Sequence, residues 1–173
     1  MSCEIPAEVL EYIELAFEAE DIRVETGCLE KYLGLQKYFP FALFPWEKFL
    51  FTLWNCTYTA QGRPRWKTAL VMVGRGAGKD GYIAFDSACS ISPYNPVSHY
   101  NVDICATNED QATQPSRDLV EVLELPRYEA KLNKHYYHTK EIIQGRKNRG
   151  VMKGRTNNPK GRDGMRSGKT IFN

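Results

Sequence analysis

The sequence has no apolar run approaching the roughly 18 residues that a membrane-spanning helix needs, and no signal-peptide pattern opens it. Its five cysteines are odd in number and scattered along the chain, and no two of them form a C-x-x-C pair. No internal repeat is visible. These absences argue against a membrane span, a disulfide framework and a zinc site, and they favour the reduced, mostly buried thiols of a cytosolic protein.

The composition indicates a globular chain whose charge is unevenly divided. With 173 residues, 42% hydrophobic and 12% aromatic, the chain has the length of one domain and can build a core. Residues 140–173 carry ten Lys or Arg and two acids, a net charge of +8, so the residues before them sum to −6. A basic run of this kind is most often a solvated face, but its alternation with glycines also fits loops that follow nucleic-acid phosphates. Both interpretations stay open here.

The most informative segment is Ala-Leu-Val-Met-Val-Gly-Arg-Gly-Ala-Gly-Lys-Asp, residues 69–80. An apolar run followed by alternating glycines and a lysine predicts a strand, a glycine-rich turn and the start of a helix. Such a turn brings backbone N–H groups and the positive end of the helix dipole to an anion. The segment is thus typical of a P-loop that holds a nucleoside triphosphate, with Lys79 at the second or third phosphate.

Two departures and two alternatives accompany this motif. The general P-loop pattern has glycine at the position of Val73 and serine or threonine at the position of Asp80. The dinucleotide fingerprint G-x-G-x-x-G fails, because Lys79 stands where its third glycine belongs. A glycine-rich turn that holds no phosphate is the structural alternative. The lysine directly after Gly78 favours the P-loop.

Hydrophobic periodicity and breaker residues predict the remaining elements. We expect helices over residues 6–20 and 29–38, a third helix from Pro45, and a strand over 66–73 that leads into a helix over 80–91. A strand over 100–107 precedes Asn108-Glu-Asp-Gln111, which has the form of a capping box, and Pro115 should kink the following helix or restart it. The strand–helix alternation implies a parallel sheet that binds ligands at the carboxyl ends of its strands.

The last third of the chain predicts short strands and no metal centre. Ile142-Ile143, Val151-Met152 and residues 169–173 have strand-forming composition. His135 and His138 could share a helix face, but no cysteine or carboxylate near them completes a ligand set. We interpret both histidines as surface or packing residues.

Four segments, in this order, resemble the ATPase domain of phage terminase large subunits. They are Phe44-Pro-Trp-Glu47, Gly74-Arg-Gly-Ala-Gly-Lys-Asp80, Ala106-Thr-Asn-Glu-Asp-Gln-Ala112 and Arg162-Asp-Gly-Met-Arg-Ser-Gly-Lys-Thr-Ile-Phe172. The second segment is the most specific, because an arginine after the first loop residue is typical of terminases and absent from most P-loop families. The resemblance implies an α/β fold with a P-loop NTPase-type parallel sheet flanked by helices. It divides the chain into a helical N-terminal extension, 1–60, and an incomplete ATPase core, 61–173.

The resemblance also implies a site and partners. ATP and Mg²⁺ are the expected ligands, with Lys79 and Arg75 in catalysis and Asp80 on the metal. The nucleotide-binding residues that it implies are Phe44, Trp46, Glu47, Gly74, Arg75, Gly76, Ala77, Gly78, Lys79 and Asp80. The expected partners are double-stranded DNA, the small terminase subunit, the portal protein and further copies in a ring, in the host cytoplasm and without a membrane. The basic surface over 146–155 is the expected DNA contact.

Three departures from the family bear on activity. Glu47 stands where the family tends to carry glutamine, and Asp80 replaces the hydroxyl residue that normally binds Mg²⁺. The resemblance puts the Walker B acids just beyond Asn173 and leaves the nuclease domain outside these residues. We therefore expect this chain alone to be inactive. A non-motor nucleic-acid-binding module is the alternative function, and a small-molecule P-loop kinase is a third, for which no lid segment is evident.

Overall fold

The computed structural model describes residues 22–139, 142–156 and 167–173. The helix expected over 6–20 lies outside these ranges. The chain forms two compact units, residues 1–30 with 44–71, and residues 31–43 with 72–173. Within the described ranges no helix is both long and apolar enough to cross a membrane.

The first unit contains a two-stranded ribbon and one long helix. Strands β1 (Ile22–Val24) and β2 (Thr57–Thr59) pair antiparallel. Helix α3 (Pro45–Cys56) begins at Pro45, as predicted, because proline has no N–H to lose at a first helical position. The N–H of Glu25 donates to the carbonyl of Cys56 at 2.8 Å, which ties the end of α3 to the chain after β1.

The helix expected over 29–38 is shorter and differently wound. Helix α2 runs over Thr26–Leu33, and a tighter 3-10 helix, η1 (Gly34–Tyr38), continues it. Gly34 is a poor α-helix former, which explains why the α-helical pattern ends there. The chain leaves η1 before Pro40, as predicted.

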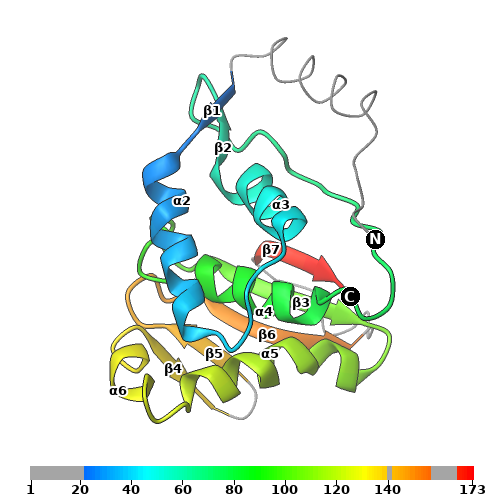
Figure 1. Cartoon of the computed structure of the whole chain (residues 1–173), viewed down its shortest axis with the longest axis vertical. Coiled ribbons are helices and arrows are strands. Elements are labelled where there is room, and N and C mark those ends of the chain that lie inside the picture. Colours follow the sequence, from blue (N-terminus) through cyan, green and yellow to red (C-terminus); the bar gives the residue numbers. More distant parts are fainter. Residues whose placement is uncertain (1–21, 140–141, 157–166) are drawn as a thin grey trace. The chain divides into compact units, whose positions relative to one another are not determined.

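The second unit is built on a five-stranded sheet (Figure 1). Its order is β4 (Tyr136–His138), β5 (Ile142–Gly145), β6 (Val151–Thr156), β3 (Asn101–Ala106) and β7 (Ser167–Phe172). Strands β6, β3 and β7 are parallel, whereas β4 pairs antiparallel with β5, and β5 pairs antiparallel with β6. The expectation of a parallel sheet is therefore right for three strands and wrong for β4 and β5. Only a few residues separate β4 from β5 and β5 from β6, and connections this short permit only antiparallel pairing.

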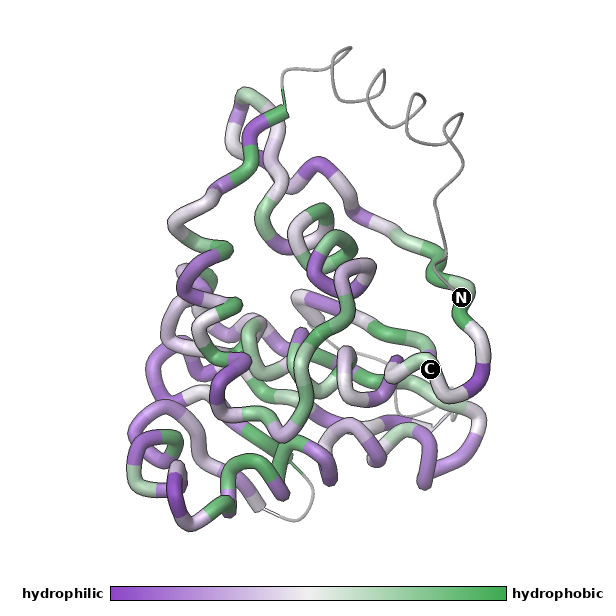
Figure 2. Tube along the Cα trace, viewed as in Figure 1, coloured by the Kyte–Doolittle hydropathy of each residue, from purple (hydrophilic) through white to green (hydrophobic). Residues whose placement is uncertain are grey.

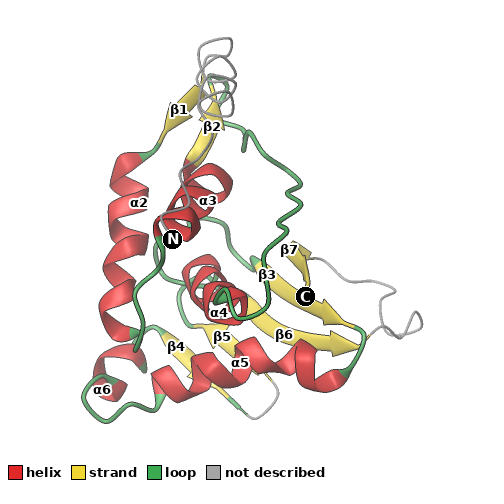
Figure 3. Cartoon of the chain, turned by 45° about the vertical axis from the view of Figure 1, so that its right-hand side comes forward, coloured by secondary structure: helices red, strands yellow, loops and turns green. Residues whose placement is uncertain are grey.

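Helices α4 (Lys79–Ser90) and α5 (Glu109–Leu123) pack against this sheet, and a short helix, α6 (Glu129–Leu132), follows α5 (Figure 3). Both long helices agree with their predicted positions. Every residue of α4 from Ile83 to Ser90 is buried. Edge-to-face contact between Phe39 and Phe85, with ring centroids 5.3 Å apart, adds the segment after η1 to the core. The sheet contributes Val102, Ile104, Ile143 and Met152, all fully buried.

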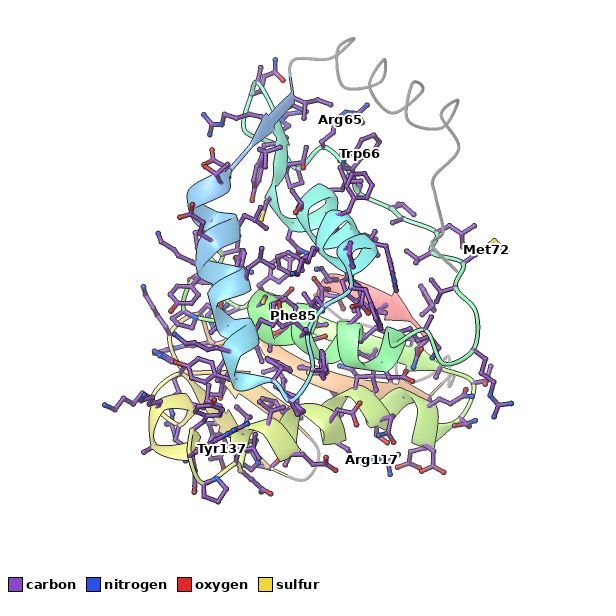
Figure 4. The ribbon with its side chains drawn as sticks, viewed as in Figure 1. Arg65, Trp66, Met72, Phe85, Arg117 and Tyr137 are labelled. Carbon is purple, nitrogen blue, oxygen red and sulfur yellow. The ribbon has the colours of Figure 1, made fainter. Side chains whose placement is uncertain are left out.

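The strand expected over 66–73 is wrong. These residues form no ladder with any described strand, and Figure 3 draws them as loop. Leu70 and Met72 are 88% and 87% exposed, and Val71 and Val73 on the alternate face are 43% and 37% exposed, so neither face of the segment is buried. Figure 2 shows hydrophobic colour along this extended stretch before α4, and Figure 4 shows Met72 pointing away from the ribbon while Phe85 points inward. Apolar composition predicts that a segment can pair but not that it has a partner.

Pro115 neither ends nor restarts α5, which runs as one helix from Glu109 to Leu123. Of the two expected effects of Pro115, a kink or a restart of the helix, the restart is therefore wrong. At the helix start, the side chain of Asn108 accepts the N–H of Gln111 at 2.8 Å, which confirms the predicted N-cap. The side chain of Gln111 instead lies 3.3 Å from the hydroxyl of Thr107.

The described glycines of the basic tail have packing roles. A Cβ at Gly145 would lie 1.9 Å from the carbonyl oxygen of Ile91, and one at Gly154 would lie 2.5 Å from that of Ala112. Gly150 and Gly168 approach the backbone and ring of Tyr100 in the same way. At these positions glycine lets a strand approach neighbouring segments of the protein closely. This packing explains the described glycines of the tail without a role in following phosphates.

Candidate functional site

The glycine-rich segment forms a turn that leads directly into α4. The carbonyl of Gly74 accepts the N–H of Ala77 at 3.2 Å, and Gly76 and Gly78 have φ of 81° and 86°. These left-handed angles favour glycine, which explains the alternation in the sequence. Gly78 is the N-cap of α4, so the first N–H groups of a 12-residue helix, which have no intrahelical acceptor, start at this turn. The turn is thus suited to an anion.

At this helix start the adjacent side chains of Lys79 and Asp80 meet that of Asn173, which comes from a distant part of the chain. The ammonium of Lys79 lies 3.0 Å from Oδ1 of Asp80 and 2.5 Å from Oδ1 of Asn173. Nδ2 of Asn173 donates to the same Asp80 oxygen at 3.0 Å. Lysine, carboxylate and amide therefore form a closed ring, in which the single positive charge is shared between one charged and one neutral oxygen.

The topology of the sheet brings Asn173 to this point. Strands β3 and β7 are parallel, and the N–H of Asn173 continues their ladder by donating to the carbonyl of Cys105 at 2.9 Å. Both strands end beside the start of α5, where Thr107 and Gln111 lie. The site therefore occupies the carboxyl edge of the parallel strands, where the strand–helix alternation predicted a ligand site.

Pro115 explains one further contact of Asn173. In a regular helix the N–H of residue 115 would donate to the carbonyl of Gln111, but proline has no N–H. Nδ2 of Asn173 donates to that carbonyl instead, at 3.2 Å. The proline in α5 thus supplies an acceptor for the amide at the end of β7.

The other predicted site residues divide between the two units. Arg75 is exposed in the same turn as Gly74 and Gly76. Phe44, Trp46 and Glu47 belong to the other unit, at the start of α3.

Glu47 caps the helix α3. Glu47 is only 2% exposed, and its carboxylate accepts the N–H of Phe44 at 2.7 Å. Burial raises the pKa of the Glu47 carboxyl, and the N–H of Phe44 partly opposes this shift. Glu47 therefore has a structural role at the start of α3, while the predicted contacts of Phe44, Trp46 and Glu47 with a nucleotide base stay predictions.

The basic turn between β5 and β6 lies at the other end of the sheet from Lys79. It precedes β6, which runs parallel to β3, so it lies at the amino ends of these strands. Arg146, Lys147 and Arg149 are exposed in this turn. The guanidinium of Arg146 donates from Nε to the carbonyls of Asn133 and Tyr136 at 2.7 and 3.1 Å, which fixes that side chain. Arg162 and Arg166 lie outside the described residues.

Each of the two histidines has a contact within the protein. No cluster of three or more His, Cys, Asp or Glu suited to a metal occurs in the part of the chain that the structure describes. Nε2 of His138 lies 3.9 Å from a carboxylate oxygen of Glu124, on α5. His135 makes an edge-to-face contact with Tyr136, and a packing role for both agrees with the sequence interpretation.

The fold and the glycine turn define an α/β protein with a candidate anion site at the end of its parallel strands. The crystal structure of the HK97 bacteriophage large terminase is similar to it, with a TM-score of 0.67 and 18% sequence identity. The similarity covers 87% of this chain and 31% of the HK97 terminase chain. No protein-family model and no curated protein sequence matches the chain. The predicted resemblance to phage large terminases is thus confirmed for the fold.

Three residues of the site were missed by reasoning from the sequence: Asn173, Thr107 and Gln111. Gln111 and Thr107 lie within a segment that carried the terminase resemblance, but only a capping role was expected from Gln111. Nothing in the sequence marks Asn173, because its place beside Lys79 depends on which strands are neighbours. The parallel pairing of β3 with β7, once known, identifies it.

Proposed function

We propose that this chain is the ATP-binding part of a phage DNA-packaging motor, a terminase large subunit that couples ATP hydrolysis to DNA translocation in the intact protein. The similarity of its fold to the HK97 large terminase supports a role related to packaging. The observation that carries the proposal is the meeting of Lys79 with the glycine turn at the start of α4. Because the chain spans less than a third of the HK97 terminase, motor activity belongs to the longer protein.

In this proposal the turn and Lys79 hold the β- and γ-phosphates of ATP. Backbone N–H groups of residues 74–79 donate to phosphate oxygens, and the ammonium of Lys79 supplies one compact positive charge. Arg75, exposed in the same turn, is free to reach the γ-phosphate, where negative charge spreads during transfer. Its role is electrostatic stabilisation of that charge.

The donor set beside Lys79 also fits Mg²⁺. Asp80 offers a carboxylate, and the oxygen of the Asn173 amide faces the same point, where the Lys79 ammonium lies. Carboxylate and carbonyl oxygens are ligands suited to a hard divalent cation. We propose Asp80 as the residue that holds Mg²⁺, which would neutralise phosphate charge when bound.

Double-stranded DNA, the small terminase subunit, the portal protein and a ring of identical copies remain the partners that we propose for the intact protein. The alternative function, a nucleic-acid-binding module whose turn grips only backbone phosphate, makes a different prediction for small ligands. Calorimetry of the 173-residue chain with ATP·Mg²⁺ and with inorganic phosphate separates them. We expect ATP to bind at least tenfold more tightly. Equal affinities would favour the module.

A further inference from the structure

The amide of Asn173 has only one orientation that fits its neighbours. The ammonium of Lys79 can only donate, so the oxygen Oδ1 must face it. The Asp80 carboxylate and the Gln111 carbonyl can only accept, so Nδ2 must face them. Both N–H groups of the amide are therefore used inside the protein, and its oxygen is aimed at the place where the Lys79 ammonium lies.

This orientation is set by elements outside the glycine turn. One N–H of the amide is taken by the Gln111 carbonyl, which Pro115 leaves without its usual helical donor. The backbone of Asn173 is fixed to β3 through the carbonyl of Cys105 at 2.9 Å. Because the side chain and backbone of Asn173 are already fixed, little conformational entropy is lost when a ligand binds beside them.

We infer that Asn173 is a specificity-determining residue that makes this site prefer nucleotide with a divalent cation over nucleotide alone. This inference rests on the proposed function. The Lys79 ammonium is the cation that the oxygens of Asp80 and Asn173 share in the structure. A bound phosphate attracts the Lys79 ammonium. The oxygens of Asp80 and Asn173 then have no positive charge beside them. A divalent cation beside the phosphates restores that charge, whereas metal-free nucleotide leaves it missing.

The arrangement predicts opposite effects of Asn173 on the two ligand forms. Without Mg²⁺, Asn173 competes with the phosphates for Lys79, so it weakens binding. With Mg²⁺, its oxygen faces the cation and supports binding. The ratio of the dissociation constant of ATP in EDTA to that in Mg²⁺ is therefore the quantity that reports on Asn173, and a purely structural role would leave this ratio unchanged.

The test is calorimetric titration of the full 173-residue chain with ATP, in EDTA and in excess Mg²⁺. We expect Asn173→Ala to lower the EDTA-to-Mg²⁺ ratio roughly tenfold and Asn173→Asp, which keeps an oxygen there, to preserve or raise it. Thr170→Ala, at an exposed position of the same strand, is the matched control and should leave the ratio as in the wild type. Thermal unfolding of each variant establishes that the compared proteins are folded.

The outcomes separate this inference from the proposed function. If wild type and Asn173→Ala, both folded, have the same ratio, the role of Asn173 is refuted while ATP binding stands. If the wild type binds ATP equally well with and without Mg²⁺, the inference is also refuted. If the wild type binds ATP under neither condition, the proposed function itself fails, and the inference with it.

Discussion

Lys169 and Asp86 form a buried ion pair that joins β7 to α4. The ammonium of Lys169 lies 3.0 and 2.9 Å from the two carboxylate oxygens of Asp86, and the two side chains are 3% and 6% exposed. Asp86 is two turns along α4 from Lys79, and Lys169 is four residues before Asn173. The ion pair therefore fixes the same helix and strand whose ends meet at the candidate site.

Breaking this pair from one side should be costly. Lys169→Met leaves a buried carboxylate without its ammonium partner, and we expect it to lower the free energy of unfolding by about 3–5 kcal/mol. The double variant Lys169→Met with Asp86→Leu removes both charges and should recover most of that loss. Urea denaturation measures both. A single variant as stable as the wild type would contradict the assigned contribution of the pair.

The buried carboxyl of Glu47 should make stability depend on pH. Its folded-state pKa is raised above 4.5 by burial, so the folded state holds the proton more tightly than the unfolded state. The free energy of unfolding should then fall as pH rises from about the unfolded-state pKa through the raised folded-state pKa. Glu47→Gln keeps an acceptor for the Phe44 N–H and should lack this fall. Urea denaturation from pH 4 to 8 measures this fall, with Glu30→Gln, at an exposed position, as the control. A fall of equal size in Glu47→Gln would contradict the prediction.

The close approach of β6 to α5 should make Gly154 intolerant of a side chain. A Cβ there would lie 2.5 Å from the carbonyl oxygen of Ala112, so Gly154→Ala should destabilise the protein by about 1–3 kcal/mol. Gly27→Ala in α2, where a Cβ meets nothing within 4 Å, should be neutral or stabilising. Thermal unfolding compares the two. Equal effects would mean that Gly154 has no packing role.

Basic residues of the turn before β6 should contact DNA without regard to sequence. Neutralising Lys147 and Arg149 should flatten the slope of log K against log salt by roughly 1.8, about 0.9 for each phosphate contact. Arg149→Asn suits its φ of 58°, and Lys147→Ala completes the variant. Arg146 is left intact because it bonds to the backbone. The control is the double variant Lys48→Ala with Lys67→Ala, which changes two exposed lysines elsewhere. An unchanged slope in the turn variant would mean that the turn is only a solvent-exposed face and does not contact DNA.

Local signals in the sequence were sufficient for the starts of α3, α4 and α5 and for the glycine turn of the site. Pro45 predicted the start of α3, Asn108 predicted the cap of α5, and the glycines before Lys79 predicted the turn that the structure contains. Each of these features depends on residues within one turn of the chain. This is why the candidate loop could be found without any knowledge of the fold.

Features that depend on distant partners could not be predicted. Residues 66–73 have the composition of a strand but pair with no described strand, and β4 and β5 reverse the expected parallel order. Asn173 reaches Lys79 only because β7 lies beside β3. The composition of a segment indicates whether it can form a strand, whereas the strand with which it pairs depends on the rest of the chain.

The most direct test of the account is the affinity of the chain for ATP·Mg²⁺ with and without the Lys79 ammonium. Lys79 supplies the compact positive charge at the helix start, so Lys79→Ala should weaken binding by about 1.5–3 kcal/mol, roughly 10- to 150-fold. Lys147→Ala, at the other end of the sheet, should leave the affinity unchanged. Calorimetry on proteins shown to be folded decides it: a loss confined to Lys79→Ala is the result we predict, and equal affinities in wild type and Lys79→Ala would contradict a phosphate-binding role for this loop.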